Sequence, residues 1–190
     1  MFRKILLALV TLVLLGTGGF LLYFGVMLPR DIPVRDIRLP TAVAQVERGR
    51  YLANHVAVCM DCHSTRDWSY FSGPLRPGTL GKGGERFDES TGLPGVVVSK
   101  NLTPAGIGEW SDGELHRAIT GGLRRNGAAL FPLMPYDAYR FMPEEDVLAI
   151  MAYLRTLESI PNEVPEHKLK FPLNFIVNSI PRAAEPRAVN

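Results

Sequence analysis

A five-residue motif, Cys59-Met60-Asp61-Cys62-His63, constrains this chain more than any other stretch. Its two thiols lie three positions apart, which places them within about one turn of a helix, and an imidazole follows at once. C-x-x-C-H is the attachment pattern of c-type haem, in which two thiols bond the porphyrin and the histidine ligates the iron. The motif therefore predicts one covalently attached haem c on Cys59 and Cys62, with His63 as an axial ligand of the iron.

Other uses of a cysteine pair fit the sequence less well. A structural zinc site takes four ligands, but Cys59 and Cys62 are the only cysteines, and the remaining histidines are scattered without ligand spacing. A thioredoxin-like dithiol needs a βαβ context, which the pattern does not show. A simple disulfide between the two cysteines stays open as an alternative.

The N-terminal stretch determines where the chain resides. Residues 5–28 carry no charged side chain, and a helix of that length crosses about 30 Å of hydrocarbon. Arg3 and Lys4 precede it, so the positive-inside rule keeps the N-terminus in the cytoplasm. A cleaved signal peptide is the alternative, but the apolar run exceeds a usual signal core and lacks an A-x-A-like exit. The sequence predicts a single-pass protein of the bacterial cytoplasmic (inner) membrane, with its haem domain in the periplasm.

Four regions follow from composition. Residues 1–30 are the predicted uncleaved anchor and residues 31–40, with two prolines, an extended tether. Residues 41–158 form the predicted haem domain, and residues 159–190 a proline-rich tail whose role the sequence leaves open. Lys and Arg total 21 against 19 Asp and Glu, so no basic surface indicates a nucleic-acid partner.

Three helices are indicated inside the domain. The first has Thr41 as N-cap and runs through Val43, Val46, Leu52 and Val56 towards the cysteines. Gly49 interrupts it, which favours the close approach of another helix. The second begins with the capping-box spacing of Ser111 to Glu114 and ends at Gly121-Gly122. The third spans about residues 143–157 and is expected to meet Gly49 through Tyr153 and Leu154.

The middle of the chain reads as irregular. Residues 64–98 are rich in Gly-Pro and Pro-Gly turns. We expect its aromatic side chains to cover a face or edge of the haem; they are Trp68, Tyr70, Phe71 and Phe87. Asn101 and Trp110, with nearby Arg or Lys, are the candidates for holding the haem propionates.

The sixth position of the iron is sought among six methionines. Met134 lies in Phe131-Pro132-Leu133-Met134-Pro135-Tyr136, a proline-bracketed loop that cannot continue as helix and can present a thioether at a fixed place. Met142 precedes Pro143 at the entrance of the last helix, where packing is the simpler role. Met134 is therefore the predicted second iron ligand.

These features together resemble class I c-type cytochromes, and more narrowly the cytochrome c subunits of bacterial membrane-bound alcohol and sugar-acid dehydrogenases. The resemblance covers roughly residues 45–158. Its matching stretches are 48–52, 59–63, 101–104, 106–108 with Trp110, 130–132, 134–136, 145–147 and 152–155. It implies an all-α class I cytochrome c fold around one haem, preceded by a transmembrane helix, with terminal helices crossing, His63 proximal and Met134 distal. Either Pro74 or the 99–101 stretch is expected to hold the proximal imidazole.

The expected function is one-electron transfer by a membrane-anchored monohaem cytochrome c, without catalysis of its own. Its expected partners are membrane lipid and redox proteins, namely a membrane dehydrogenase, a quinol-oxidising complex or a terminal oxidase. A fixed electron-transfer subunit of a larger complex is the close alternative. Relatives often carry three haem domains, whereas this chain has one C-x-x-C-H motif. A haem enzyme or gas sensor with an open distal position is the alternative from another class.

Overall fold

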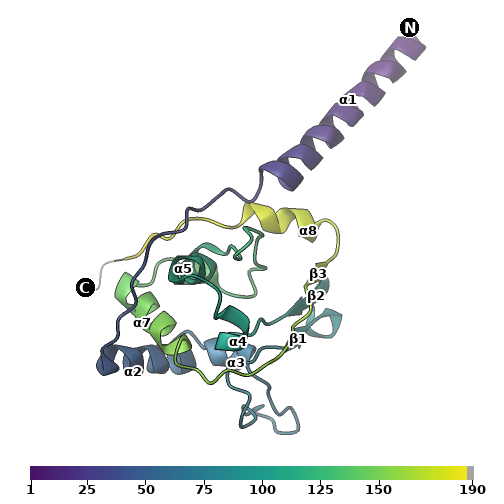
Figure 1. Cartoon of the computed structure of the whole chain (residues 1–190). Coiled ribbons are helices and arrows are strands. Elements are labelled where there is room, and N and C mark those ends of the chain that lie inside the picture. The colour runs from purple at the N-terminus through teal and green to yellow at the C-terminus, as the bar shows by residue number, and fades with distance from the viewer. Residues whose placement is uncertain (188–190) are drawn as a thin grey trace.

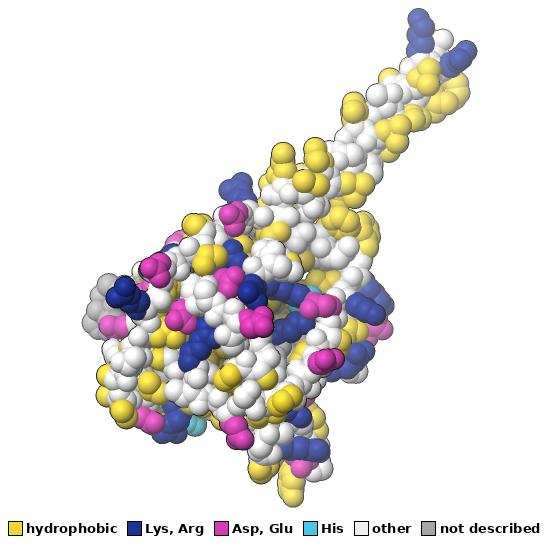
Figure 2. Space-filling view, in the orientation of Figure 1, with side chains coloured by type: hydrophobic (Ala, Val, Ile, Leu, Met, Phe, Trp, Pro, Cys, Tyr) yellow, Lys and Arg dark blue, Asp and Glu magenta, His cyan; other side chains and the backbone are white. Residues whose placement is uncertain are grey.

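The computed structural model describes residues 1–187, and its first element stands apart from the rest. Helix α1 (Phe2–Leu22) continues into the π-helical turn η1 (Tyr23–Met27) and projects from the body (Figure 1). Hydrophobic side chains cover α1 along its length, with basic side chains at its tip (Figure 2). Its length and composition allow it to cross a membrane, although a signal sequence has the same properties.

The body is mostly helical and carries short strands. Its helical elements are α2 (Val43–Tyr51), η2 (Leu52–Val56), α3 (Cys59–His63), η3 (Glu89–Thr91), α4 (Pro104–Ile107), α5 (Asp112–Gly121), α6 (Tyr136–Tyr139), α7 (Glu144–Leu154), α8 (Leu173–Ile176) and η4 (Val177–Ser179). Its strands are β1 (Arg86–Phe87), β2 (Gly95–Val98) and β3 (Lys168–Leu169).

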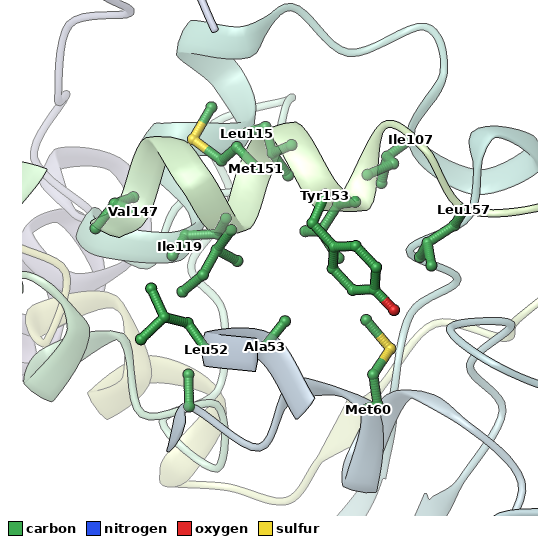
Figure 3. Packing of buried hydrophobic residues seen from close by; sticks show 13 residues of the cluster. Leu52, Ala53, Met60, Ile107, Leu115, Ile119, Val147, Met151, Tyr153 and Leu157 are labelled. Atoms are coloured by element: carbon green, nitrogen blue, oxygen red, sulfur yellow. The ribbon is translucent and has the colours of Figure 1, made fainter. Parts of the chain in front are cut away.

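The crossing of α2 and α7 forms the centre of the core. Gly49 is buried, and a Cβ atom built on it would lie 1.9 Å from the carbonyl oxygen of Ala149. The two backbones therefore touch at this point, as the glycine predicted. The contact lies at Ala149 and Ile150, one turn before the predicted Tyr153 and Leu154. Figure 3 shows the apolar side chains that fill the space around the crossing.

The helix that precedes the cysteine motif, α2 with η2, differs from the prediction at its start and in its second half. Its N-cap is Ala42, with no side-chain hydrogen bond, and not Thr41. After Tyr51 the helix widens into the π-helix η2, which rotates the later residues relative to a regular helix. Val56, at the end of η2, is exposed, whereas Leu52 is buried in the core. Val43, at the first position of α2, is exposed as well.

Helix α5 follows its sequence signals closely. The side chain of Ser111 accepts from the Glu114 backbone N–H, and Glu114 bonds back to the Ser111 N–H, so the predicted capping box is formed. Gly122 ends the helix in the left-handed conformation. The extended stretch 31–40 packs on this helix, since a Cβ on Gly113 would lie 1.9 Å from the Arg35 carbonyl oxygen. That stretch is therefore held against the domain.

A small antiparallel sheet, of order β1-β2-β3, departs from the all-α expectation. Arg86 pairs with Val98 in its first half, and Gly95 pairs with Leu169 in its second. Strands of two to four residues are too short to give a period-two pattern, which is why the sequence did not indicate them. The third strand comes from the proline-rich tail, which therefore packs on the domain. The end of the tail also contacts the domain, because the Glu185 N–H donates to the Arg140 carbonyl and the Arg187 N–H to the Phe141 carbonyl. Residues 188–190 lie outside the described residues.

Candidate functional site

Helix α3 is a single turn that carries the cysteine motif. Cys59 and Cys62 are free thiols, three positions apart in this turn. The side chain of Met60, between them, is buried in the core, with 1% of its surface exposed. Val58, immediately before α3, adopts the left-handed conformation with φ 47°. A β-branched residue is strained there by about 1–3 kcal/mol, so the fold holds the start of the motif in a costly geometry.

His63 is oriented by the backbone. Its Nδ1 lies 2.7 Å from the carbonyl oxygen of Lys100, just after β2. Because a carbonyl oxygen only accepts, Nδ1 carries the proton and Nε2 keeps a free lone pair. Burial lowers the pKa of His63, although the Lys100 carbonyl opposes the shift, and the ring stays neutral. A neutral imidazole with a free Nε2 is the form that binds iron. Of the two stretches considered for this contact, the structure favours 99–101 over Pro74.

A large cavity lies beside α3. Its volume is about 900 Å³, at the upper end for small-molecule sites, and most of its lining is apolar. Its walls include both motif cysteines, His63, Met134 and residues of β2, α5 and the tail. The structure thus brings four of the predicted cofactor-binding residues to one cavity, although they are up to 75 positions apart in the sequence.

Tyr136 holds the loop that carries Met134 in place. This side chain is buried to 1% exposure, donates its hydroxyl to the Leu130 carbonyl, and lies against Gly122, where a Cβ would come within 2.5 Å of its ring. The backbone N–H of Tyr136 also donates to the Met134 carbonyl over 2.8 Å. Met134 therefore faces the cavity from a stiff turn. Met134 and Met142 both pack against the hydrophobic core, but of the two only Met134 also lines the cavity.

The electrostatics of the two thiols disfavour an exposed reactive cysteine. Burial raises the pKa of Cys59 to about 12. Burial and the charge of Asp61 also raise the pKa of Cys62. Thiolate is the nucleophilic form of cysteine, so neither residue resembles the catalytic thiol of a protease or oxidoreductase. A cavity lined by two neutral thiols, a neutral imidazole and a thioether fits a haem c that is bonded and ligated there.

Asn101 and Trp110 also line the cavity, but Asn101 is largely engaged elsewhere. Its Oδ1 accepts from the backbone and hydroxyl of Thr103 over 2.9 and 2.7 Å, and its Nδ2 donates to the Ile160 carbonyl over 2.8 Å. These bonds join the turn before α4 to the chain that follows α7. Trp110 is partly buried against the core. A contact of either residue with propionates stays a prediction.

Arg124 is the site residue that sequence reasoning did not single out. It lines the cavity, and its buried Nε finds no hydrogen-bond partner in residues 1–187. Its guanidinium also contacts Glu166 and His167 of the tail. An unpaired buried N–H is costly, and an anionic group in the cavity would satisfy it. No spacing signal marks Arg124, since its partners lie about 40 residues further along the chain.

The aromatic loop expected over the haem is turned outward instead. Trp68 and Tyr70 are about two-thirds exposed and Phe71 fully so, while Phe87 alone of the four lines the cavity. The loop folds onto itself, because Arg66 donates from Nε to the Gly73 carbonyl over 2.8 Å and pairs with Leu75. The expectation for Trp68, Tyr70 and Phe71 was wrong.

Comparison with known proteins identifies relatives of the chain. The chain is 34% identical over 137 residues to the fructose dehydrogenase cytochrome subunit of Gluconobacter japonicus, covering 70% of this chain and 25% of that protein. It is 36% identical over 118 residues to the gluconate 2-dehydrogenase cytochrome c subunit of Pantoea cypripedii, covering 58% and 22%. The cytochrome c subunit of the quinone-dependent alcohol dehydrogenase of Gluconacetobacter polyoxogenes is 31% identical over 113 residues, 58% of this chain and 21% of that protein. No protein-family model matches the chain.

The chain is thus homologous to cytochrome c subunits of membrane-bound alcohol, fructose and gluconate dehydrogenases. It spans a quarter or less of the length of the three relatives just described. The similarity confirms the resemblance inferred from the sequence motifs and supports a cytochrome c fold around the cavity.

Proposed function

We propose that the chain is a membrane-anchored monohaem cytochrome c that carries single electrons between respiratory-chain partners on the periplasmic side of the bacterial inner membrane. The observation that carries the proposal is the joint lining of one cavity by Cys59, Cys62, His63 and Met134. In the proposed protein the class I cytochrome domain spans residues 41–158. Residues 1–30 are retained as a single-pass anchor with a cytoplasmic N-terminus.

Each residue has a defined part in this function. Cys59 and Cys62 attach the porphyrin, so the cofactor cannot leave when its redox state changes. His63 offers Nε2 to the iron in an orientation set by the Lys100 carbonyl. Met134 would offer its thioether to the iron from the loop before α6, and Arg124 would offer its unpaired Nε–H to a carboxylate of the cofactor. The haem supplies the one-electron chemistry, and a His/Met pair favours a high reduction potential.

The test of attachment is the double substitution Cys59→Ala with Cys62→Ala. The wild-type protein should keep its haem stain after denaturing electrophoresis, and the double variant should lose it. Asp61→Asn, which leaves both thiols in place, is the matched control and should retain the stain. Haem that stays covalently bound to the double variant contradicts the proposal.

Anchoring has its own measurement. The intact mass of the purified chain should equal the full sequence from Met1 plus one haem. A mature chain that begins between Thr17 and Ile32 identifies the segment as a signal peptide and contradicts the anchor.

A second role needs a separate test, because the named relatives are subunits of dehydrogenases. In this role the chain is a fixed electron-transfer subunit of a larger membrane complex. Purification in mild detergent, followed by identification of the proteins that accompany it in constant proportion, separates the two. A stable dehydrogenase partner favours the fixed subunit, and isolation of the chain alone favours the free carrier.

A further inference from the structure

The segment Phe171–Ile180, which contains α8 and η4, packs against the body-proximal end of the apolar helix (Figure 1). The centroid of the Phe175 ring lies 6.0 Å from that of Phe20, and a Cβ atom built on Gly25 would lie 4.0 Å from the Phe175 ring. Asn178 donates from Nδ2 to the Phe24 carbonyl over 3.1 Å. The tail is therefore fixed beside residues 20–25.

The depth of these residues in a bilayer follows from helix geometry. A helix rises 1.5 Å per residue, so about 20 residues cross a hydrocarbon core of about 30 Å. Arg3 and Lys4 mark the inner boundary, and about 20 residues counted from Ile5 end near Phe24. A tilt of about 20° moves the outer boundary by only a residue or two, still within η1. Phe175, in contact with Phe20, then lies at the outer edge of the hydrocarbon.

The side chains that the tail leaves exposed suit this depth. Phe171 is 74% exposed and Ile176 42% exposed, and the rings of Phe171 and Phe175 meet edge-on with centroids 6.1 Å apart. Aromatic and aliphatic groups of this kind favour the boundary between headgroups and acyl chains. Lys168 and Arg182 flank the segment and are exposed, where anionic headgroups attract them.

From these contacts we propose that Phe171–Ile180 is inserted at the outer boundary between headgroups and acyl chains, as a second, non-spanning attachment of the domain. The proposal rests on the anchoring part of the proposed function. Lipid covers the exposed side of this segment, because the segment packs directly beside the spanning helix. Phe171 and Ile176 flank Phe175, so in this arrangement their exposed sides face lipid.

Nitroxide labels on the full-length, haem-loaded protein test the insertion. Phe171→Cys and Ile176→Cys are labelled in vesicles of phosphatidylethanolamine and phosphatidylglycerol, where thioether bonds protect Cys59 and Cys62. Phe71→Cys is the matched control, since Phe71 is an exposed phenylalanine in the loop after α3, which lies at the opposite end of the body from α1 (Figure 1). Collisions with oxygen, which concentrates in hydrocarbon, are compared with collisions with a water-soluble nickel chelate.

At Phe171→Cys and Ile176→Cys the ratio of oxygen to nickel collisions should exceed the control value several-fold. A ratio equal to that of Phe71→Cys overturns the proposal, and so does shielding from both reagents, which would identify a protein on this surface. Haem content and chain mass are measured on the same samples. A sample without covalent haem contradicts the cytochrome function, while the label ratios judge the insertion independently.

Discussion

Nδ1 of His63 and the carbonyl oxygen of Lys100 lie 2.7 Å apart, across 37 positions of sequence. The side chain of Lys100 in turn donates to the Pro165 carbonyl over 3.1 Å and to Glu166 over 3.0 Å. One residue thus orients the imidazole with its backbone and holds the tail with its ammonium group. The proximal side of the cavity and the tail are consequently one hydrogen-bonded unit.

The first prediction concerns the distal ligand. Met134→Ala should open the sixth iron position, lower the reduction potential and let carbon monoxide bind the reduced protein, because the thioether that lines the cavity is removed. Optical titration with carbon monoxide and potentiometry measure both effects. Met142→Ala is the control and should cost stability while leaving the spectrum unchanged, since Met142 packs on the core. The reverse pattern would assign the ligand to Met142.

A second prediction concerns the contact between α2 and α7. Gly49→Ala should destabilise the domain by about 3 kcal/mol, because its Cβ would lie 1.9 Å from the Ala149 carbonyl and the helices would have to separate. Denaturant unfolding followed by circular dichroism measures the change. Gly18→Ala places the same substitution in α1, where no neighbour among residues 1–187 comes within 4 Å of the added Cβ, and it should leave the domain's stability unchanged. Equal stability of the two variants would contradict the close crossing.

The third prediction uses the strained residue before the motif. Val58→Gly should stabilise the domain by about 1 kcal/mol, because glycine accepts φ 47° without the clash of a branched side chain. The melting temperature should rise by about 4 °C. Val56→Gly, in the π-helix η2, is the control and should lower it, since glycine is unfavourable inside a helix. A drop with Val58→Gly would mean that the valine side chain itself is needed.

The fourth prediction is a pH dependence of stability. Burial and the charge of Arg124 lower the pKa of His167 to about 4, against about 6.5 in the unfolded chain. Between these values the unfolded chain binds the proton and the folded protein does not, so stability should fall as pH drops from about 6.5 to about 4. Desolvation raises the pKa of Glu166, but its bonds from Arg124 and Lys100 outweigh this and hold the pKa at about 2. The stability contributed by its charge is therefore lost mainly below pH 4.5, the ordinary pKa of the carboxyl.

Denaturant unfolding at several pH values measures this slope. His167→Gln should make the slope shallower without abolishing it, because burial also lowers the pKa of His116. His55→Gln, at an exposed position, serves as the control. An unchanged slope in His167→Gln would show that the tail histidine is protonated as easily in the folded protein as in the unfolded one.

Sequence signals were interpreted correctly where both interacting residues belong to the same helix. The Ser111–Glu114 capping box and the Gly122 stop lie within one helix, and each is formed as its spacing predicts. Gly49 also indicated a close helix contact, because absence of a side chain is visible in the sequence. Its partner was placed one turn away, since the pattern of α7 does not tell which backbone atom will touch it.

Contacts made by backbone atoms or by distant residues could not be read in this way. The contact of the Lys100 carbonyl with His63 involves a backbone atom, so no side chain in the sequence indicates it. Arg124 contacts tail residues about 40 positions further along the chain, and no local pattern indicates such a contact. The outward turn of Trp68 and Phe71 illustrates the same limit. Their hydrophobicity favoured burial, but the hydrogen bond from Arg66 to Gly73 closes the loop on itself and leaves them on the surface.

The position of the tail in the cavity wall has a consequence for assembly. Val164, Glu166 and His167 complete the lining, about 100 residues after the two cysteines. In a chain that is synthesised and exported from its N-terminus, the thiols of the motif emerge while this wall does not yet exist. In the proposed cytochrome the haem would therefore meet the two thiols before Val164, Glu166 and His167 complete that wall of the cavity.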